Sequence, residues 1–165
     1  MISQGCTRIV HISGNQKRNV YKDRFEGYRK ALEDSSIGFS EDLLIVGELT
    51  EDSGIEAAHN ILKMKPLPDA IFSANDICAA SCMQVLKQNG IRIPEDIAMT
   101  GFNNDPVSRL TEPNLTTVNY PAFRMGEIAA TNLINHLQGV SSIFDTHKII
   151  LKSELLVRES SLKRK

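Results

Sequence analysis

The sequence predicts an α/β fold, a flavodoxin-like parallel sheet with helices on both faces. Short apolar runs alternate with segments of helical periodicity, as in strand–helix–strand units with right-handed crossovers. Two of these runs end abruptly in Asn and Asp, in the segments PDAIFSAND (68–76) and DIAMTGFNND (96–105). Asn75 and Asn103 are 28 positions apart, close to the roughly 30 residues of one such unit. We therefore expect both corners at the carboxyl edge of one sheet, where open α/β sheets bind ligands.

The first half of the chain contains three predicted strand–helix pairs. Strands are predicted at residues 8–13, 43–49 and 70–73, each an apolar run. Helices are predicted at 21–34 and 55–64, with a turn at 50–54 before the second helix and two prolines after it. A third helix is predicted to begin at the Asn75/Asp76 cap and to run to residue 89, where Gly90 ends it.

The second half begins in the same way and then departs from the pattern. A fourth strand is predicted at 97–100, an irregular stretch at 106–113 and a short fifth strand at 115–118, giving the expected order 2-1-3-4-5. An alanine-rich helix is predicted at 122–137, followed by extended segments at 147–157. Tyr120 and Pro121 indicate a hinge, so we expect the later residues to belong partly to another lobe.

Composition excludes several classes of protein. The 165 residues fit one domain or slightly more. Lys plus Arg is 19 and Asp plus Glu is 20, for a net charge of −1, so no broad positive field for nucleic acid is expected. No apolar run is long enough for a membrane span. The start lacks a secretion signal, which predicts a cytoplasmic location, although the natural N-terminus is expected to lie upstream. The basic ending at 162–165 is expected to be a solvated tail.

No catalytic or metal-binding set stands out. Cys78 and Cys82 are one helical turn apart, but the four histidines are scattered, so we interpret the cysteines as small residues on a buried helix face. Phosphate-binding loops and the nucleophile elbow are absent. Asp76 and Asp105 remain as an acid–base pair without a nucleophile. The sequence therefore predicts a protein that is not an enzyme and that needs no metal or cofactor.

The two corners each allow a structural and a functional interpretation. Asn75 is either a helix cap or a ligand contact, and Asn103 is either a turn residue or a ligand contact. An amide both donates and accepts hydrogen bonds, which suits a hydroxyl-rich ligand. Arg18 and Arg24 follow the first strand. Because an arginine near a helix start opposes the helix dipole, this placement indicates a ligand-facing role, with a surface role as the alternative.

Several longer segments, in this order, resemble the C-terminal part of LacI/GalR-family bacterial transcriptional regulators. They are RIVHISG (8–14), RFEGYRKAL (24–32), PDAIFSAND (68–76), GIRIPEDI (90–97), GFNN (101–104), PNLTTV (113–118) and ELLVRES (154–160).

The resemblance implies a two-lobed effector domain like the sugar-binding proteins of the periplasm, without the N-terminal helix-turn-helix headpiece. Residues 1–118 would form the C-terminal lobe, one lobe of a type I periplasmic-binding-protein-like fold. Residues 119–155 would be the crossover, helix and strand of the other lobe, and 156–165 a return segment and tail. A small-molecule effector, a sugar or derivative, would control operator DNA binding by the headpiece. The alternative is a sugar-binding protein of a transport system.

The resemblance also implies site residues and a dimer. The family's ligand contacts match Arg24, Arg18, Val20, Leu49, Asn75 and Asn103. Two positions depart from the family pattern, because Asn103 replaces the commonest aspartate and Leu49 replaces an aromatic stacking residue. The helix at 77–89 is a dimer face in the family. Its residues Ala79, Ala80, Met83 and Leu86 would therefore form a homodimer interface or pack on the sheet.

Overall fold

The computed structural model describes residues 1–142 and 148–163. The chain divides into two compact units. Unit 1 consists of Met1–Val118 and Leu155–Lys165, and unit 2 is Asn119–Glu154. The candidate site lies in unit 1.

A four-stranded parallel sheet forms the centre of unit 1. Its strands are β1 (Ile9–Ser13), β2 (Leu44–Val46), β3 (Ala70–Ser73) and β4 (Ala98–Thr100), in the order β2-β1-β3-β4. The predicted order is thus confirmed for these four strands. An isolated parallel bridge between Thr100 and Thr116 continues the sheet beyond β4.

The predicted fifth strand differs from the expectation. β5 (Thr117–Asn119) begins two residues later than predicted and pairs with β6 (Glu154–Leu156) in a separate two-stranded sheet. The chain after β4 turns through positive φ angles at Asn103 and Asn104, of 119° and 59°. Up to this point the two segments run side by side, because the Gly101 N–H donates to the Thr116 carbonyl at 2.8 Å and the Asn103 N–H to the Val118 carbonyl at 3.0 Å. The positive φ angles are incompatible with strand geometry and end this pairing.

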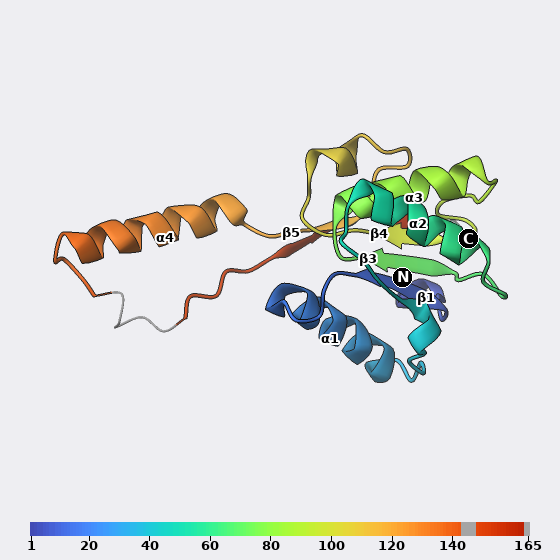
Figure 1. The fold of residues 1–165 in the computed structure, drawn as a ribbon, viewed down its shortest axis with the longest axis horizontal. Coiled ribbons are helices and arrows are strands. Elements are labelled where there is room, and N and C mark those ends of the chain that lie inside the picture. The colour runs from blue at the N-terminus through green and yellow to red at the C-terminus, as the bar shows by residue number, and fades with distance from the viewer. Residues whose placement is uncertain (143–147, 164–165) are drawn as a thin grey trace. The chain divides into compact units, whose positions relative to one another are not determined.

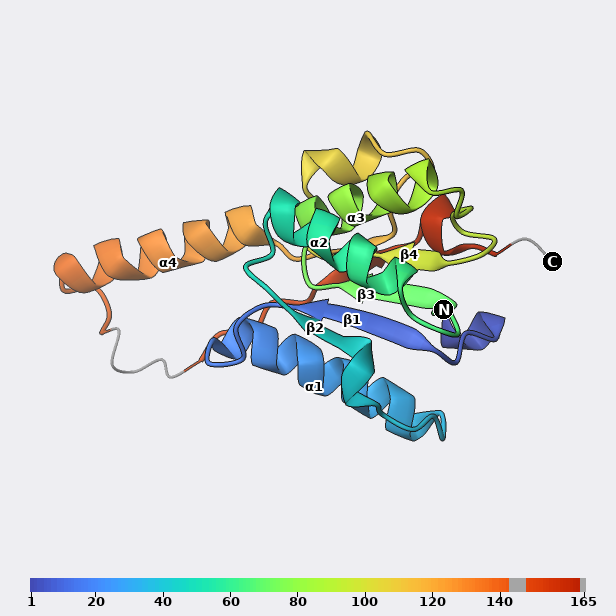
Figure 2. The same cartoon turned by 45° about the vertical axis from the view of Figure 1, so that its right-hand side comes forward.

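Helices cover both faces of the sheet, as predicted. α1 (Asn19–Asp34) lies on one face, while α2 (Glu51–Leu62) and α3 (Asp76–Gln88) lie on the other, as Figures 1 and 2 show. Successive side chains of β1 point to opposite faces of the sheet and so belong to two different hydrophobic clusters. Val10 and Ile12 join the cluster under α2 and α3, whereas Ile9 packs with Tyr28 and other residues on the α1 side.

The start of α2 corrects the predicted turn at 50–54. The Thr50 hydroxyl accepts a hydrogen bond from the Ser53 backbone N–H at 3.2 Å, so Thr50 is the N-cap and the helix begins at Glu51. Short 3₁₀ helices complete unit 1. They are η1 (Ile2–Gln4), η2 (Glu41–Leu43), η3 (Pro106–Arg109) within the stretch expected to be irregular, and η5 (Glu159–Ser161).

Unit 2 contains α4 (Ala122–Leu137), with the predicted bounds. Every residue of α4 remains at least partly exposed. Among the described residues of the extended segment predicted at 147–157, only Glu154–Leu156 form a strand, which is β6. His147, at the start of that segment, and Arg164 and Lys165 of the predicted basic tail lie outside the described residues.

Candidate ligand-binding site

The two asparagine corners meet at the carboxyl edge of the sheet. Phe72 pairs with Thr100 in the parallel ladder, so β3 and β4 end at the same edge. The Asp105 backbone N–H donates to Asp76 Oδ2 at 2.8 Å, which ties the second corner to the first turn of α3. The prediction that both corners share one edge is therefore confirmed.

Arg24 connects α1 to both corners. Its Nη1 donates to the carbonyl oxygen of Ala74, the residue before Asn75. Its guanidinium carbon lies 3.6 Å from the centroid of the Phe102 ring, next to Asn103. A cation above an aromatic face is held by the ring quadrupole, and a planar guanidinium stacks well there. Arg24, Asn75 and Asn103 are thus brought to one place from three separate segments.

Asn75 is a helix cap and a cross-link at the same time. Its Oδ1 accepts from the Cys78 backbone N–H at 2.9 Å, which caps α3. Its Nδ2 donates to the Leu49 carbonyl oxygen at 2.7 Å. An amide can make four hydrogen bonds, and these two leave capacity for a ligand. The structural interpretation of Asn75 is correct, and it does not exclude the functional one.

Leu49 takes part through its backbone. Its side chain is 4% exposed and belongs to the core cluster under α2 and α3, while its φ of 59° turns the chain after β2. The carbonyl oxygen faces Asn75. The sequence reasoning considered Leu49 as a side chain that could contact a ligand. The structure instead directs that side chain into the core.

Asn103 is held in an unusual backbone conformation. A φ of 119° is costly for any residue other than glycine. Its backbone N–H donates to the Val118 carbonyl at 3.0 Å, and its Nδ2 donates to Asp105 Oδ2 at 3.2 Å. These bonds, together with those of the next two residues, fix the direction of the half-buried side chain.

The first turn of α1 holds the two remaining predicted residues. Arg18 is the exposed N-cap residue of α1, and Val20 is 46% exposed in the same turn. This turn follows β1, so it also lies at the carboxyl end of the sheet. The structure gives both side chains a solvent-facing position.

Asp76 holds the second corner in place from the protein interior. It is fully buried, and its carboxylate accepts from the Thr117 hydroxyl at 2.7 Å and from the Asp105 backbone N–H. Burial raises the pKa of Asp76, and these two hydrogen bonds oppose that effect. Gly101 is required beside it, because a Cβ at this position would collide with the Asp76 carboxylate. Asp76 therefore has a structural role, which argues against the acid–base pair with Asp105.

Sequence reasoning missed Phe102 and Thr117. Phe102 supports Arg24, and Thr117 joins Asp76 to the corner through its hydroxyl. Residue spacing along one chain gives no signal for a contact between α1 and a distant loop. The only available signal for Phe102 was its position between Gly101 and Asn103.

Within the described residues, no group of three or more His, Cys, Asp or Glu side chains is placed to hold a metal ion. Cys78 and Cys82 are free thiols, fully buried in the core. Burial raises the pKa of the Cys78 thiol to about 11. No helix in the part of the chain that the structure describes is long and apolar enough to cross a membrane.

Comparisons with known proteins place this chain in a family. A family model described as a periplasmic binding protein-like domain matches residues 1–161. The HTH-type transcriptional regulator CelR of Thermobifida fusca is 34% identical over 160 residues, which is 97% of this chain and 46% of CelR. The HTH-type transcriptional repressor PurR of Yersinia enterocolitica is 34% identical over the same length, again covering 97% of this chain and 46% of that protein.

Solved structures agree with the sequence relatives. A complex of CelR with cellobiose superposes with a TM-score of 0.87 at 34% identity, covering 97% of this chain and 48% of that one. A putative LacI-type regulator from Bacillus cereus gives 0.91 at 27% identity, covering 99% and 57%. The chain spans about half the length of the sequence relatives that it matches. It belongs to the family of periplasmic-binding-protein-like domains and is homologous to the LacI-family transcriptional regulators.

Proposed function

We propose that this chain is the effector-binding part of a LacI-type transcriptional regulator. The observation that carries the proposal is the convergence of Arg24, Asn75 and Asn103 at the carboxyl edge of a parallel sheet. This edge is the usual ligand position in open α/β sheets. Arg18 and Val20, exposed at the same edge, are proposed as peripheral contacts.

The chemistry of the three central residues suits a small, uncharged, hydroxyl-rich molecule. Arg24 offers N–H donors, and Ala74 and Phe102 fix the plane of its guanidinium. The amides of Asn75 and Asn103 both donate and accept, and so do hydroxyl groups. A sugar or sugar derivative fits this set. The amide at Asn103 has one acceptor oxygen where a carboxylate has two, so it cannot accept from two neighbouring hydroxyls through separate oxygens. The hydroxyl arrangement of the preferred sugar should therefore differ from that of aspartate-bearing relatives.

A regulator is favoured over a transport protein and over an enzyme. The relatives described above are transcriptional regulators, and one of them, CelR, is known in complex with cellobiose. The proposed action is a shift in a conformational equilibrium. An effector favours one state of the whole protein only by its difference in affinity between the two states, and this difference changes operator affinity. DNA contact itself is assigned to a headpiece outside this sequence, which implies a cytoplasmic protein.

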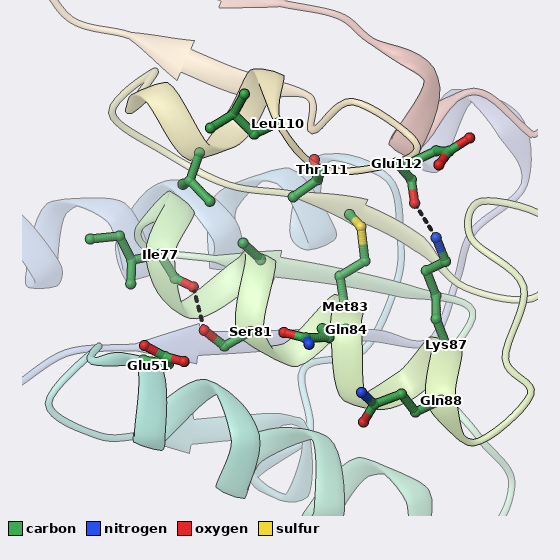
Figure 3. Close-up of a pocket in the computed structure, with 12 residues that line it drawn as sticks. Glu51, Ile77, Ser81, Met83, Gln84, Lys87, Gln88, Leu110, Thr111 and Glu112 are labelled. Carbon is green, nitrogen blue, oxygen red and sulfur yellow. Dashed lines mark hydrogen bonds between the residues drawn. The ribbon is translucent and has the colours of Figure 1, made fainter.

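A homodimer is proposed through the outer surface of α3 and η3. Figure 3 shows the residues that line a cavity there, among them Ile77 and Leu110. The volume of this cavity is about 540 Å³. These two side chains are 47% and 82% exposed. Of the two interpretations of this helix, packing on the sheet holds for Ala79, Met83 and Leu86, which are buried in the core. Ala80 is partly exposed and lines the cavity. The proposed interface therefore uses Ile77 and Leu110, and Leu110→Glu should shift sedimentation toward the monomer.

The binding proposal is tested by heteronuclear NMR titration of the chain with cellobiose and a panel of monosaccharides and disaccharides. We expect weak, saturable shifts centred on Asn75 and Asn103. Arg24→Ala should abolish these shifts while leaving the sheet resonances in place. Arg29→Ala is the matched control, because Arg29 lies on the same helix but stacks on Phe39, at 5.5 Å. Shifts that survive Arg24→Ala would contradict the proposal.

The regulator assignment is tested separately with DNA. A gel-shift assay of this chain with operator-length duplexes at physiological salt should show no retardation, because the net charge is −1. Calorimetry on the product of the complete gene should then show both effector binding and effector-dependent DNA affinity. Tight DNA binding by the 165 residues alone would overturn the assignment of DNA contact to another segment.

A further inference from the structure

The segment Arg158–Ser161 is built into the interior of unit 1. Ser160 is fully buried, and its hydroxyl donates to the Met99 carbonyl at 2.7 Å while accepting from the Thr116 N–H at 2.8 Å. It thereby bridges β4 and the chain that leads into β5. The Thr116 hydroxyl in turn exchanges two hydrogen bonds with the backbone of Arg158, at 2.7 and 2.9 Å. Both the backbone N–H and the carbonyl of Arg158 are thus hydrogen-bonded to Thr116.

The side chain of Arg158 reaches from this segment to the Asn103 corner. Its Nη1 donates to the Leu115 carbonyl at 2.8 Å and to the Ser108 hydroxyl at 2.9 Å. Its Nη2 donates to Asn104 Oδ1 at 2.8 Å. Hydrogen bonds from a charged donor are about twice as strong as neutral ones, and a guanidinium forms them in a fixed planar geometry. Arg158 therefore links the Asn104 side chain to Leu115 and to Ser108.

Each residue of the Asn103 corner, which is Asn103, Asn104 and Asp105, has its backbone N–H hydrogen-bonded to a different partner. The N–H groups of Asn103, Asn104 and Asp105 donate to the Val118 carbonyl, the Thr117 hydroxyl and the Asp76 carboxylate, at 3.0, 3.2 and 2.8 Å. Asn104 has a left-handed φ of 59°, next to the 119° of Asn103. Two successive positive φ angles persist only where the surroundings over-determine them. The bond from Arg158 adds a side-chain restraint on Asn104.

We propose that Arg158 is a positioning residue for the ligand site, which sets the direction of the Asn103 side chain by holding Asn104 in its left-handed conformation. It acts through Asn104 and does not touch the ligand. The ligand-related half of this inference rests on the proposed function, whereas the positioning half concerns the corner alone.

Amide hydrogen exchange measured by NMR tests the positioning. Arg158→Lys keeps the charge and loses the planar fork, so exchange at Asn103, Asn104 and Asp105 should accelerate about tenfold or more. The amides of β1 and β3 report global stability and should change much less. Arg109→Lys is the matched control, because Arg109 is exposed on nearby η3, and it should leave the corner unchanged.

A second variant keeps the test decisive if Arg158→Lys fails to fold. Asn104→Asp gives Arg158 a carboxylate partner, so corner exchange should slow in the wild-type background. In the Arg158→Gln background the same change should lose this benefit. If neither Arg158 variant folds, unchanged or faster corner exchange in Asn104→Asp alone overturns the positioning role. Additive effects of the two substitutions, or an unchanged corner in a folded Arg158→Lys protein, would overturn the positioning role.

The ligand consequence has a separate readout. With cellobiose or any sugar that the panel identifies, Arg158→Lys should raise Kd about tenfold, and Arg109→Lys should not. If the wild-type chain and the complete gene product bind no sugar while the corner still loosens, the proposed function fails and the positioning role stands. If Kd is unchanged while the corner loosens, the link from Arg158 to ligand affinity is refuted.

Discussion

At the scale of single residues, the site is built from groups that also hold the fold together. Asn75 caps α3 with its oxygen and ties the Leu49 carbonyl with its nitrogen. Asp76 holds both Thr117 and Asp105. The convergence of Arg24, Asn75 and Asn103 could be predicted because strand ends are visible in the sequence. The contributions of Phe102 and the Leu49 carbonyl could not, because a ring contact and a backbone acceptor leave no pattern in residue spacing.

The two bonds of Asn75 can be separated by Asn75→Asp. Aspartate caps a helix as well as asparagine does, so the cap alone predicts no loss. The substitution also removes the donor to the Leu49 carbonyl and places a carboxylate oxygen next to it. We expect a loss of about 1–3 kcal/mol in the free energy of unfolding, measured by urea denaturation. Stability equal to wild type would show that the bond to Leu49 contributes nothing.

His11 should make the fold sensitive to mild acid. It is fully buried in β1, stacks on Phe72 with ring centroids 4.6 Å apart, and has Nδ1 2.9 Å from the Phe72 carbonyl oxygen. Burial lowers the pKa of His11 from 6.5 to about 4. The folded state therefore resists protonation more than the unfolded state does. Its contribution to stability is complete above pH 6.5 and is lost as the pH falls toward 4.

The size of this acid sensitivity follows from the shift. A difference of about 2–3 pKa units corresponds to about 3 kcal/mol between neutral pH and pH 4. Urea denaturation at several pH values should show this loss in the wild type. In His11→Phe the stacked ring remains and the titrating group is gone, so the slope between pH 6.5 and 4 should be smaller by that amount. An unchanged slope in this variant would assign the acid sensitivity to other groups.

At the scale of elements, the contact between α2 and α3 shows why helix boundaries are harder to predict than strand order. Gly54 suggested a turn in the sequence, yet it lies inside α2 and is buried. A Cβ at Gly54 would collide with the Cys78 carbonyl oxygen of α3 and approach Ser81 Cβ to 2.9 Å. The glycine is there because two helices approach closely, and this is a tertiary requirement that local sequence cannot reveal.

A matched pair of glycine substitutions tests this explanation. Gly27 lies in α1, and apart from its chain neighbours and the adjacent backbone of the helix, no atom lies within 4 Å of a Cβ built there. Gly27→Ala should raise the free energy of unfolding by about 0.5–1 kcal/mol, because alanine is the better helix former. Gly54→Ala gains the same helix propensity but forces α3 away, so a net loss of about 1–3 kcal/mol is expected. Chemical denaturation of both variants measures the contrast, and equal effects would refute close helix contact as the reason for Gly54.

At the scale of the whole molecule, the repeat of strands and helices was enough to predict a parallel sheet covered on both faces. It was not enough to predict the fate of the fifth strand. That strand lies beside the chain after β4 only as far as the bond from the Asn103 N–H to the Val118 carbonyl, and it then pairs with β6. The positive φ angles of Asn103 and Asn104 end the pairing with β4, and hydrogen bonds between this corner and distant residues such as Arg158 and Asp76 hold these angles. The site and the departure from the expected sheet therefore have a common physical cause.

The two units should differ in local stability within this 165-residue chain. α4 has 16 residues, close to the length below which an isolated helix is marginal in water. Five of its large apolar side chains are exposed, namely Phe123, Met125, Leu133, Ile134 and Leu137. Hydrogen exchange should therefore show protection factors below about 10 in α4, against about 1,000 or more in β1 and β3. Measurements at tenfold dilution provide the control, because protection of α4 that falls on dilution indicates burial against a second copy. Strong protection independent of concentration would contradict the prediction, since the exposed face of α4 offers no buried contacts to slow exchange.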